Sequence, residues 1–214
     1  MKIIVTVGMP GSGKSSHAKF IGDKYGFPLL ETHTPLYDEL KKRGLSGTVD
    51  NIKKVTIELK KVSDSYLTEK LIEIVKRDYR DKKLVFLSGI RAWSEIEILR
   101  KEFGGNNVFV ATFLASRKSR FQRVAKPKKG FDFVGESTRE SEKKLKEKKE
   151  EEALIKKLEE FIKKDEKDLG WGLAKVIALA DYFIITESEK YPHKSWEATD
   201  KEFEEIVNEI LKQK

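Results

Sequence analysis

The chain of 214 residues contains no cysteine and only three histidines, two methionines and five prolines. Without cysteine it can form neither a disulfide nor a thiolate zinc site, and it has no cysteine nucleophile. The histidines are scattered along the sequence, which argues against a metal site built from imidazoles. Asparagine and glutamine are also scarce while lysine and glutamate are abundant, and this composition is typical of thermophilic proteins.

Long apolar runs are absent as well. No stretch of 18 apolar residues occurs, so the sequence predicts no membrane-spanning helix and no membrane partner. The apolar run that follows Met1-Lys2 is too short for the core of a signal peptide. Hydrophobic residues still make up 38% of the chain, which is enough for a core. We therefore expect a soluble, cytoplasmic protein with a single domain, 1–214.

Positively charged residues are in moderate excess over negatively charged ones. There are 44 Lys and Arg residues against 36 Asp and Glu residues, which gives a net charge of +8. A basic surface favours anionic partners such as nucleotides, RNA or anionic lipid, or it serves solubility alone. The charge by itself does not separate these alternatives.

Short β-branched segments alternate with segments of helical periodicity. The predicted strands cover residues 2–7, 27–31, 84–87, 108–114 and 182–185. Helices are expected between them, with Thr34, Ser94 and Thr199 as N-caps and a break near 63–65. This alternation predicts an α/β fold with three layers, in which helices cover both faces of a five-stranded parallel sheet.

One segment departs from that alternation. Between Glu140 and Asp168, 21 of 29 residues are charged, yet apolar residues at 154–162 keep a helical spacing. The segment is predicted to be a long, solvated helix within an inserted charged helical lid, 117–169. The apolar face is expected to pack on the parent domain, and a partner surface is the alternative.

The sequence from Gly8 to Ser15 fits the pattern G-x-x-x-x-G-K-[ST] and stands between a buried strand and a helix. Backbone N–H groups of such a loop converge on phosphates, the lysine reaches the β- and γ-phosphates, and the serine hydroxyl can bind Mg²⁺. The pattern predicts a P-loop that binds ATP, with Ser15 as metal ligand. The expected nucleotide-binding residues are Gly8, Pro10, Gly11, Ser12, Gly13, Lys14, Ser15 and Ser16.

A loop of the form G-x-P-G-S-G-K-S directly after the first strand resembles that of adenylate kinase and related nucleotide kinases. Gly89-Ile90-Arg91, the arginines after the fourth strand, and the stretch from Lys164 to Tyr182 extend this resemblance. Together they resemble an archaeal adenylate-kinase-like family, some members of which are described as dephospho-CoA-kinase-like. The resemblance implies a nucleotide-kinase fold with ATP and Mg²⁺ as cofactors, and this chain as a divergent member.

The chain departs from that family at three positions. The resemblance implies an Asp at the end of the third strand, to hold the water shell of Mg²⁺, but the chain has Ser88 there. It also implies an Asp and an acceptor-gripping Arg after the second strand, where the chain has Thr34 and Tyr37. Glu31, at the end of the second strand, could contact Mg²⁺ or the acceptor, or cap the next helix. Nucleotide binding is therefore expected, while the acceptor site stays open.

Arg91, Arg120 and Arg123 complete the set of candidate catalytic residues with Lys14. Arg91 follows a strand that ends beside the loop, where ligands of parallel sheets bind. The other two lie in a basic cluster, 117–129, which contains no acidic residue. We expect a phosphate clamp there, with an RNA-contacting patch or a solvated helix face as alternatives.

These observations favour a kinase that transfers the γ-phosphoryl group of ATP to a small, unidentified acceptor. A catalytically weak regulatory module that binds nucleotide is the first alternative. An RNA-linked ATPase or kinase is the second.

Overall fold

The computed structural model describes residues 1–63, 65–125, 140–187 and 195–213, apart from the side chains of 49, 60 and 140–150. Five parallel strands form one sheet in the order β2-β3-β1-β4-β5. The strands are β1 (Lys2–Val7), β2 (Leu29–Glu31), β3 (Leu84–Ser88), β4 (Val108–Leu114) and β5 (Tyr182–Ile185). The predicted five-stranded parallel sheet is thus confirmed.

Helices connect successive strands, as parallel pairing requires. They are α1 (Lys14–Tyr25), α2 (His33–Lys42), α3 (Val49–Val62), α4 (Tyr66–Asp78), α5 (Trp93–Phe103), the 3₁₀ turn η1 (Gly105–Asn107), α6 (Arg117–Ala125), α7 (Glu140–Gly170), α8 (Leu173–Ala178) and α9 (Trp196–Lys212). The predicted break in the segment 51–80 is confirmed, because α3 ends at Val62 and α4 begins at Tyr66.

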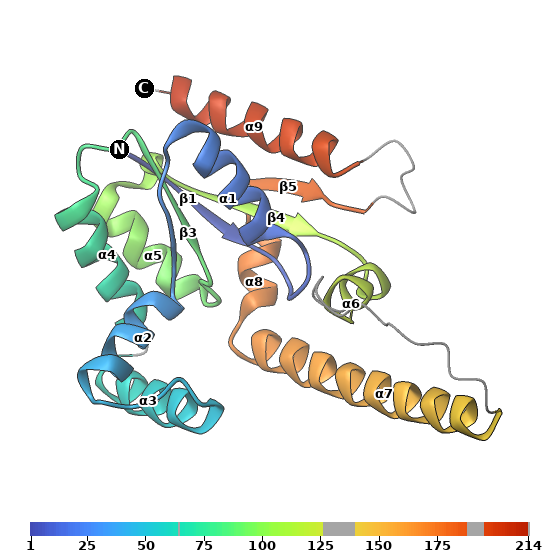
Figure 1. Ribbon diagram of the computed structural model, residues 1–214. Coiled ribbons are helices and arrows are strands. Elements are labelled where there is room, and N and C mark those ends of the chain that lie inside the picture. The colour runs from blue at the N-terminus through green and yellow to red at the C-terminus, as the bar shows by residue number, and fades with distance from the viewer. Residues whose placement is uncertain (64, 126–139, 188–194, 214) are drawn as a thin grey trace.

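Successive residues of β1 point to opposite faces of the sheet, and each face has its own core. Ile4 packs with Ala18 and Ile21 of α1 and with Phe203 of α9. On the other face, Ile3 and its neighbours in register pack against α4, α5 and α8. Figure 1 shows α1 and α9 on one side of the sheet and α4, α5 and α8 on the other. The fold therefore has the three α/β layers expected of a P-loop protein.

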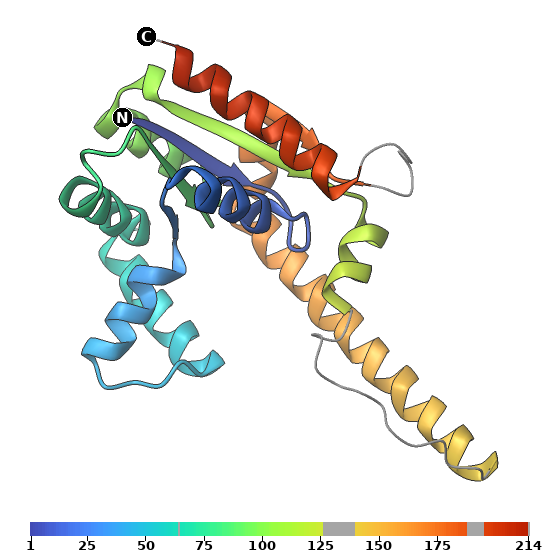
Figure 2. The same cartoon turned by 45° about the horizontal axis from the view of Figure 1, so that its top comes forward.

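Two helical parts extend from the carboxyl end of the sheet (Figures 1 and 2). One contains α2 and α3, which share a small third core of Leu36, Leu40, Val55 and Leu59. The other is α7, a single helix of 31 residues that projects away from the sheet. The predicted lid, 117–169, corresponds to α6, the segment 126–139 and α7 up to its next-to-last residue. The segment 126–139 lies outside the described residues. The two parts stand on either side of the phosphate loop.

Three predicted N-caps are wrong by a few residues. α2 begins at His33, so Pro35 lies inside the first turn, where the N–H that it lacks has no helical partner anyway. α5 begins at Trp93 with Ala92 rather than Ser94 as its N-cap, and Glu95 accepts the N–H groups at its start. α9 begins one turn early because Ser195 accepts the N–H of Ala198 at 3.2 Å.

Candidate nucleotide site

The phosphate loop joins β1 to α1, and glycine is required in it for steric reasons. Gly11 has a φ of +81°, and a Cβ there would lie 2.7 Å from the carbonyl oxygen of Arg120. Gly8 has a φ of +146°, and a Cβ would lie 2.5 Å from the carbonyl oxygen of Phe113. Only glycine fits both the backbone conformation and the space. Gly13 then serves as the N-cap of α1, so that the positive end of that helix faces the loop.

Lys14 is the first residue of α1, directly after the loop, and lines the cavities described below. Burial, followed by the nearby charge of Arg91, lowers the pKa of Lys14 from 10.5 to about 8. The nearby carboxylates of Asp168 and Glu31 raise the pKa again only in part. An anion such as a phosphate would compensate for the lost solvation and the repulsion.

Ser15 meets two side chains from neighbouring strand ends. Its hydroxyl donates to Oε1 of Glu31 at 2.8 Å and lies 3.1 Å from Oγ of Ser88. Glu31 and Ser88 are direct partners in the register of β2 and β3. The second oxygen of Glu31, Oε2, lies 3.4 Å from Nε2 of His33. Three oxygen-bearing side chains therefore converge beside Lys14.

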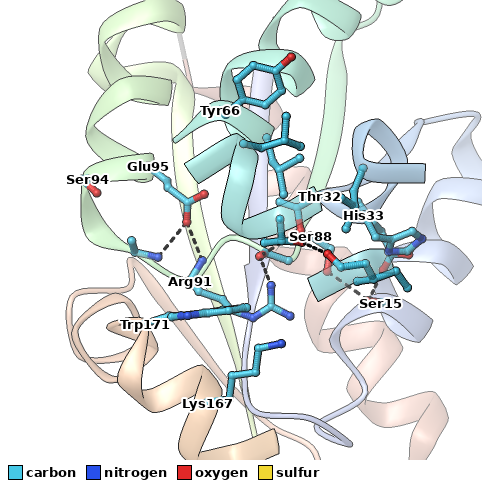
Figure 3. Close-up of a pocket in the computed structure, with 18 of the residues that line it drawn as sticks. Ser15, Thr32, His33, Tyr66, Ser88, Arg91, Ser94, Glu95, Lys167 and Trp171 are labelled. Atoms are coloured by element: carbon cyan, nitrogen blue, oxygen red, sulfur yellow. Dashed lines mark hydrogen bonds and ion pairs between the residues drawn. The ribbon is translucent and has the colours of Figure 1, made fainter. Parts of the chain in front are cut away.

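Arg91 lies at the end of this site, directly after β3. Its Nε donates to Asp168 of α7 at 2.7 Å, and its Nη1 donates to the carbonyl of Gly89 at 2.9 Å. The guanidinium is 5.1 Å from the ring centre of Trp171, and Nζ of Lys167 is 4.5 Å from the same ring. Figure 3 shows these three side chains together. The predicted phosphate-binding arginine is thus near the loop, but a carboxylate engages it.

Arg120 and Arg123 of α6 contact the carbonyl groups of the phosphate loop. Arg120 donates to Pro10 O at 3.0 Å and forms two hydrogen bonds of 2.8 Å with the carboxylate of Asp165 on α7. Arg123 donates to Gly11 O at 3.2 Å and Ser12 O at 3.3 Å. Such contacts stabilise the conformation in which the N–H groups of the loop face an anion.

Two cavities meet at Lys14 and Arg91. The larger, of about 480 Å³, extends from Lys14 and Ser15 to an apolar wall made by α2, α3 and α4. Figure 3 shows Tyr66 at the end of it that is opposite Lys167. The smaller, of about 440 Å³, lies between the phosphate loop and α7. The loop therefore has one chamber on each side.

The structure brings some predicted residues together and places others elsewhere. Lys14, Ser15 and Arg91 line the larger cavity, whereas Arg120 and Arg123 line neither of the two. Tyr37 is exposed and also lies outside both. The basic residues of 126–129 are outside the described part of the chain, so the RNA-contacting patch stays a prediction.

Sequence reasoning gave Asp165 and Asp168 no functional role, although both fall in the stretch that resembles the archaeal family. Both are buried although they lie in the most charged segment of the chain. Their spacing of three residues puts them on one side of α7, but so many charges surround them that the spacing alone carries no signal. His17 of α1 is buried: its ring stacks against Phe113 and Trp196 and contacts Asp200 at 2.6 Å.

Comparisons with known proteins show the family of this chain. The AAA domain family model matches residues 7–136, which is more than half of the chain. A UPF0200 protein of Thermococcus sibiricus is 30% identical over 187 residues, covering 87% of this chain and 86% of the relative. The chain belongs to the UPF0200 family. A second member, from Thermococcus onnurineus, is 29% identical over 98% of both chains.

Family membership supports a P-loop protein of the nucleotide-kinase-like superfamily, and it identifies no acceptor. A gluconokinase structure from Sinorhizobium meliloti is 22% identical, with a TM-score of 0.34 over 57% of this chain and 62% of that one. This likeness is too low to bear on the substrate. In the part of the chain that the structure describes, no helix combines the length and apolar character needed to cross a membrane.

Proposed function

We propose that this protein binds ATP·Mg²⁺ at residues 8–16 and transfers the γ-phosphoryl group to a small acceptor in the larger cavity. The observation that carries the proposal is the position of that cavity. It begins at Lys14 and Ser15, where the phosphates of a bound nucleotide would end, and continues to an apolar wall. A volume of about 480 Å³ is in the range of sites that enclose a small molecule.

The residues around the cavity have distinct roles in this proposal. Lys14 and the start of α1 hold the phosphates, and Ser15 with its neighbouring oxygens suits a hard cation. Mg²⁺, when bound, would neutralise the charge that develops on the phosphoryl oxygens. Arg91 lines both cavities. Its guanidinium could contact the transferred phosphoryl group once its hydrogen bond to Asp168 is broken. Arg120 and Arg123 hold the loop and would have to leave its carbonyls to act as a clamp.

Filling the cavity tests the acceptor assignment. Thr56 lines it from α3, whereas Val62 on the same helix is 75% exposed. ADP formation would be measured with a panel of nucleoside monophosphates, nucleosides and hydroxy acids. We expect at least one compound to stimulate ADP formation, Thr56→Trp to abolish that stimulation without weakening ATP binding, and Val62→Trp to change neither. Full stimulation in Thr56→Trp would show that the acceptor binds elsewhere.

A regulatory module is the second candidate, and the ion pairs of α7 favour it. Asp165 and Asp168 connect α7 to Arg120 at the loop and to Arg91 after β3. Nucleotide binding that changes these pairs would alter the position of α7. Hydrogen exchange on 117–125 and 151–170, with and without ATP·Mg²⁺, tests this candidate. Changed protection without stimulation by any compound of the panel would favour the module, while unchanged protection would contradict it.

A further inference from the structure

We infer that Glu31 supplies the carboxylate of the Mg²⁺ site, from the end of β2. The inference rests on the proposed binding of ATP·Mg²⁺ and names the residue that makes this binding depend on the metal. Ser15 is the serine whose hydroxyl a P-loop offers to Mg²⁺. Its hydroxyl donates to Oε1 of Glu31 at 2.8 Å, so the carboxylate is already within reach of a cation held by Ser15.

The register of the sheet explains why β2 can provide this group. Glu31 and Ser88 are paired residues at the ends of adjacent parallel strands, and both contact Ser15. A carboxylate at either position therefore reaches the same hydroxyl. Position 88 offers only a serine, which is neutral and binds a hard cation less strongly than a carboxylate does. In this chain the negative charge comes from the neighbouring strand.

The other acidic side chains that line the two cavities have other roles or are distant. Glu95 accepts the N–H groups of Arg91 and Ala92 and the hydroxyl of Thr68. Asp168 accepts Nε of Arg91, and Glu160 is exposed on α7. Among the described acidic residues that line these cavities, Glu31 is the one in contact with Ser15.

Capping of the next helix does not account for the position of Glu31. The N-cap of α2 is Thr32, and the side chain of Glu31 points to Ser15 across the strand ends instead. A glutamate placed here contributes a full negative charge beside Lys14 and the loop, where ATP alone would bring more negative charge. Repulsion between this carboxylate and ATP is relieved when a divalent cation lies between them.

Calorimetry of ATP binding with Mg²⁺ and with EDTA tests the inference in the full chain. Wild type should bind ATP more tightly with Mg²⁺. In Glu31→Gln, which keeps the size and the acceptor oxygen, the enhancement by Mg²⁺ should fall ~10-fold or more, as when partners of a metal ligand are removed. Affinity in EDTA should stay equal or rise. Glu95→Gln is the matched control from the same cavity and should retain the enhancement.

A double variant that moves the carboxylate to the neighbouring strand separates loss of the metal site from damage to the fold. Glu31→Ser combined with Ser88→Asp moves the carboxylate to the paired position and should restore the Mg²⁺ enhancement. Paramagnetic Mn²⁺ provides a direct probe: its spectrum with ATP and wild type should report a bound ion, and Glu31→Gln should weaken that signal.

The possible results separate this inference from the proposed function. If wild type binds ATP under neither condition, the proposed function fails. If wild type binds with Mg²⁺ and Glu31→Gln retains the full enhancement, the assignment of Glu31 is wrong and the proposed function stands. If Glu31→Gln loses only acceptor-stimulated turnover, Glu31 acts on the acceptor, and the metal assignment is again overturned.

Discussion

Replacing Lys14 by methionine should stabilise the fold while removing ATP binding. Methionine has a similar length but carries no charge, so it avoids the burial penalty that lowers the pKa of Lys14 from 10.5 to about 8. At about 1.4 kcal/mol per pKa unit, this difference corresponds to about 3 kcal/mol. We therefore expect Lys14→Met to raise the free energy of unfolding by up to about 3 kcal/mol near pH 7.

The gain should depend on pH in a defined direction. Between pH 8 and 10.5 the unfolded chain keeps a proton on Lys14 that the folded protein has released, so the stability of wild type rises with pH across this window. Lys14→Met has no such proton. Its advantage should be complete below pH 8 and should disappear as the pH approaches 10.5.

Urea unfolding of wild type and variant at pH 7 and at pH 10 measures this difference. Lys19→Met is the matched control on α1, because Lys19 is exposed and forms a surface ion pair with Asp23. It should change stability little at either pH. A Lys14→Met variant that is no more stable than wild type at pH 7, or whose gain is the same at both pH values, would refute the reasoning.

Three further predictions concern the same site. First, the phosphates of ATP should raise the pKa of Lys14, so ATP binding should take up protons near pH 8.5 and few protons near pH 7. Calorimetry in buffers of different ionisation enthalpy measures this uptake. Equal proton uptake at the two pH values would contradict the prediction. Second, Arg120→Met should lower the free energy of unfolding by about 3–5 kcal/mol, because Asp165 is left buried and unpaired. Adding Asp165→Leu should recover much of this loss, as urea unfolding would show. If Arg120→Met alone is as stable as wild type, the ion pair with Asp165 does not stabilise the fold. Third, turnover of ATP with AMP should be weak, since Tyr37 stands where the family resemblance implies an arginine. The charge-assisted contact of such an arginine contributes roughly 2–3 kcal/mol. A coupled assay showing tens of turnovers per second, on the order of ordinary kinases, would be inconsistent with this.

Local patterns predicted the sheet and the phosphate loop because each depends on residues that are close in sequence. The β-branched strands and the alternating helices define a parallel sheet, and Gly8 to Ser15 contains the complete phosphate-loop pattern. Helix starts were less accurate. The N-cap of α9 lies four residues before the expected Thr199 and that of α5 two residues before the expected Ser94, since several residues in each segment can accept the same N–H groups.

The roles of the charged side chains were decided by tertiary structure. The sequence identified Arg91, Arg120 and Arg123 as phosphate-binding candidates, but it could not show that Asp165 and Asp168, more than 40 residues later, would engage two of them. A guanidinium forms the same hydrogen bonds with a carboxylate as with a phosphate. Which anion it contacts therefore depends on how α7 packs.

The sequence by itself determined that the protein is a P-loop member of the α/β class, because hydrophobic periodicity and loop chemistry are local properties. Only the tertiary structure decided that Glu31 and Ser88 would meet at Ser15, and that a cavity would open beside Lys14. Both depend on strand register and on the packing of α2, α3 and α4. These are long-range contacts, whose partners a single sequence does not specify.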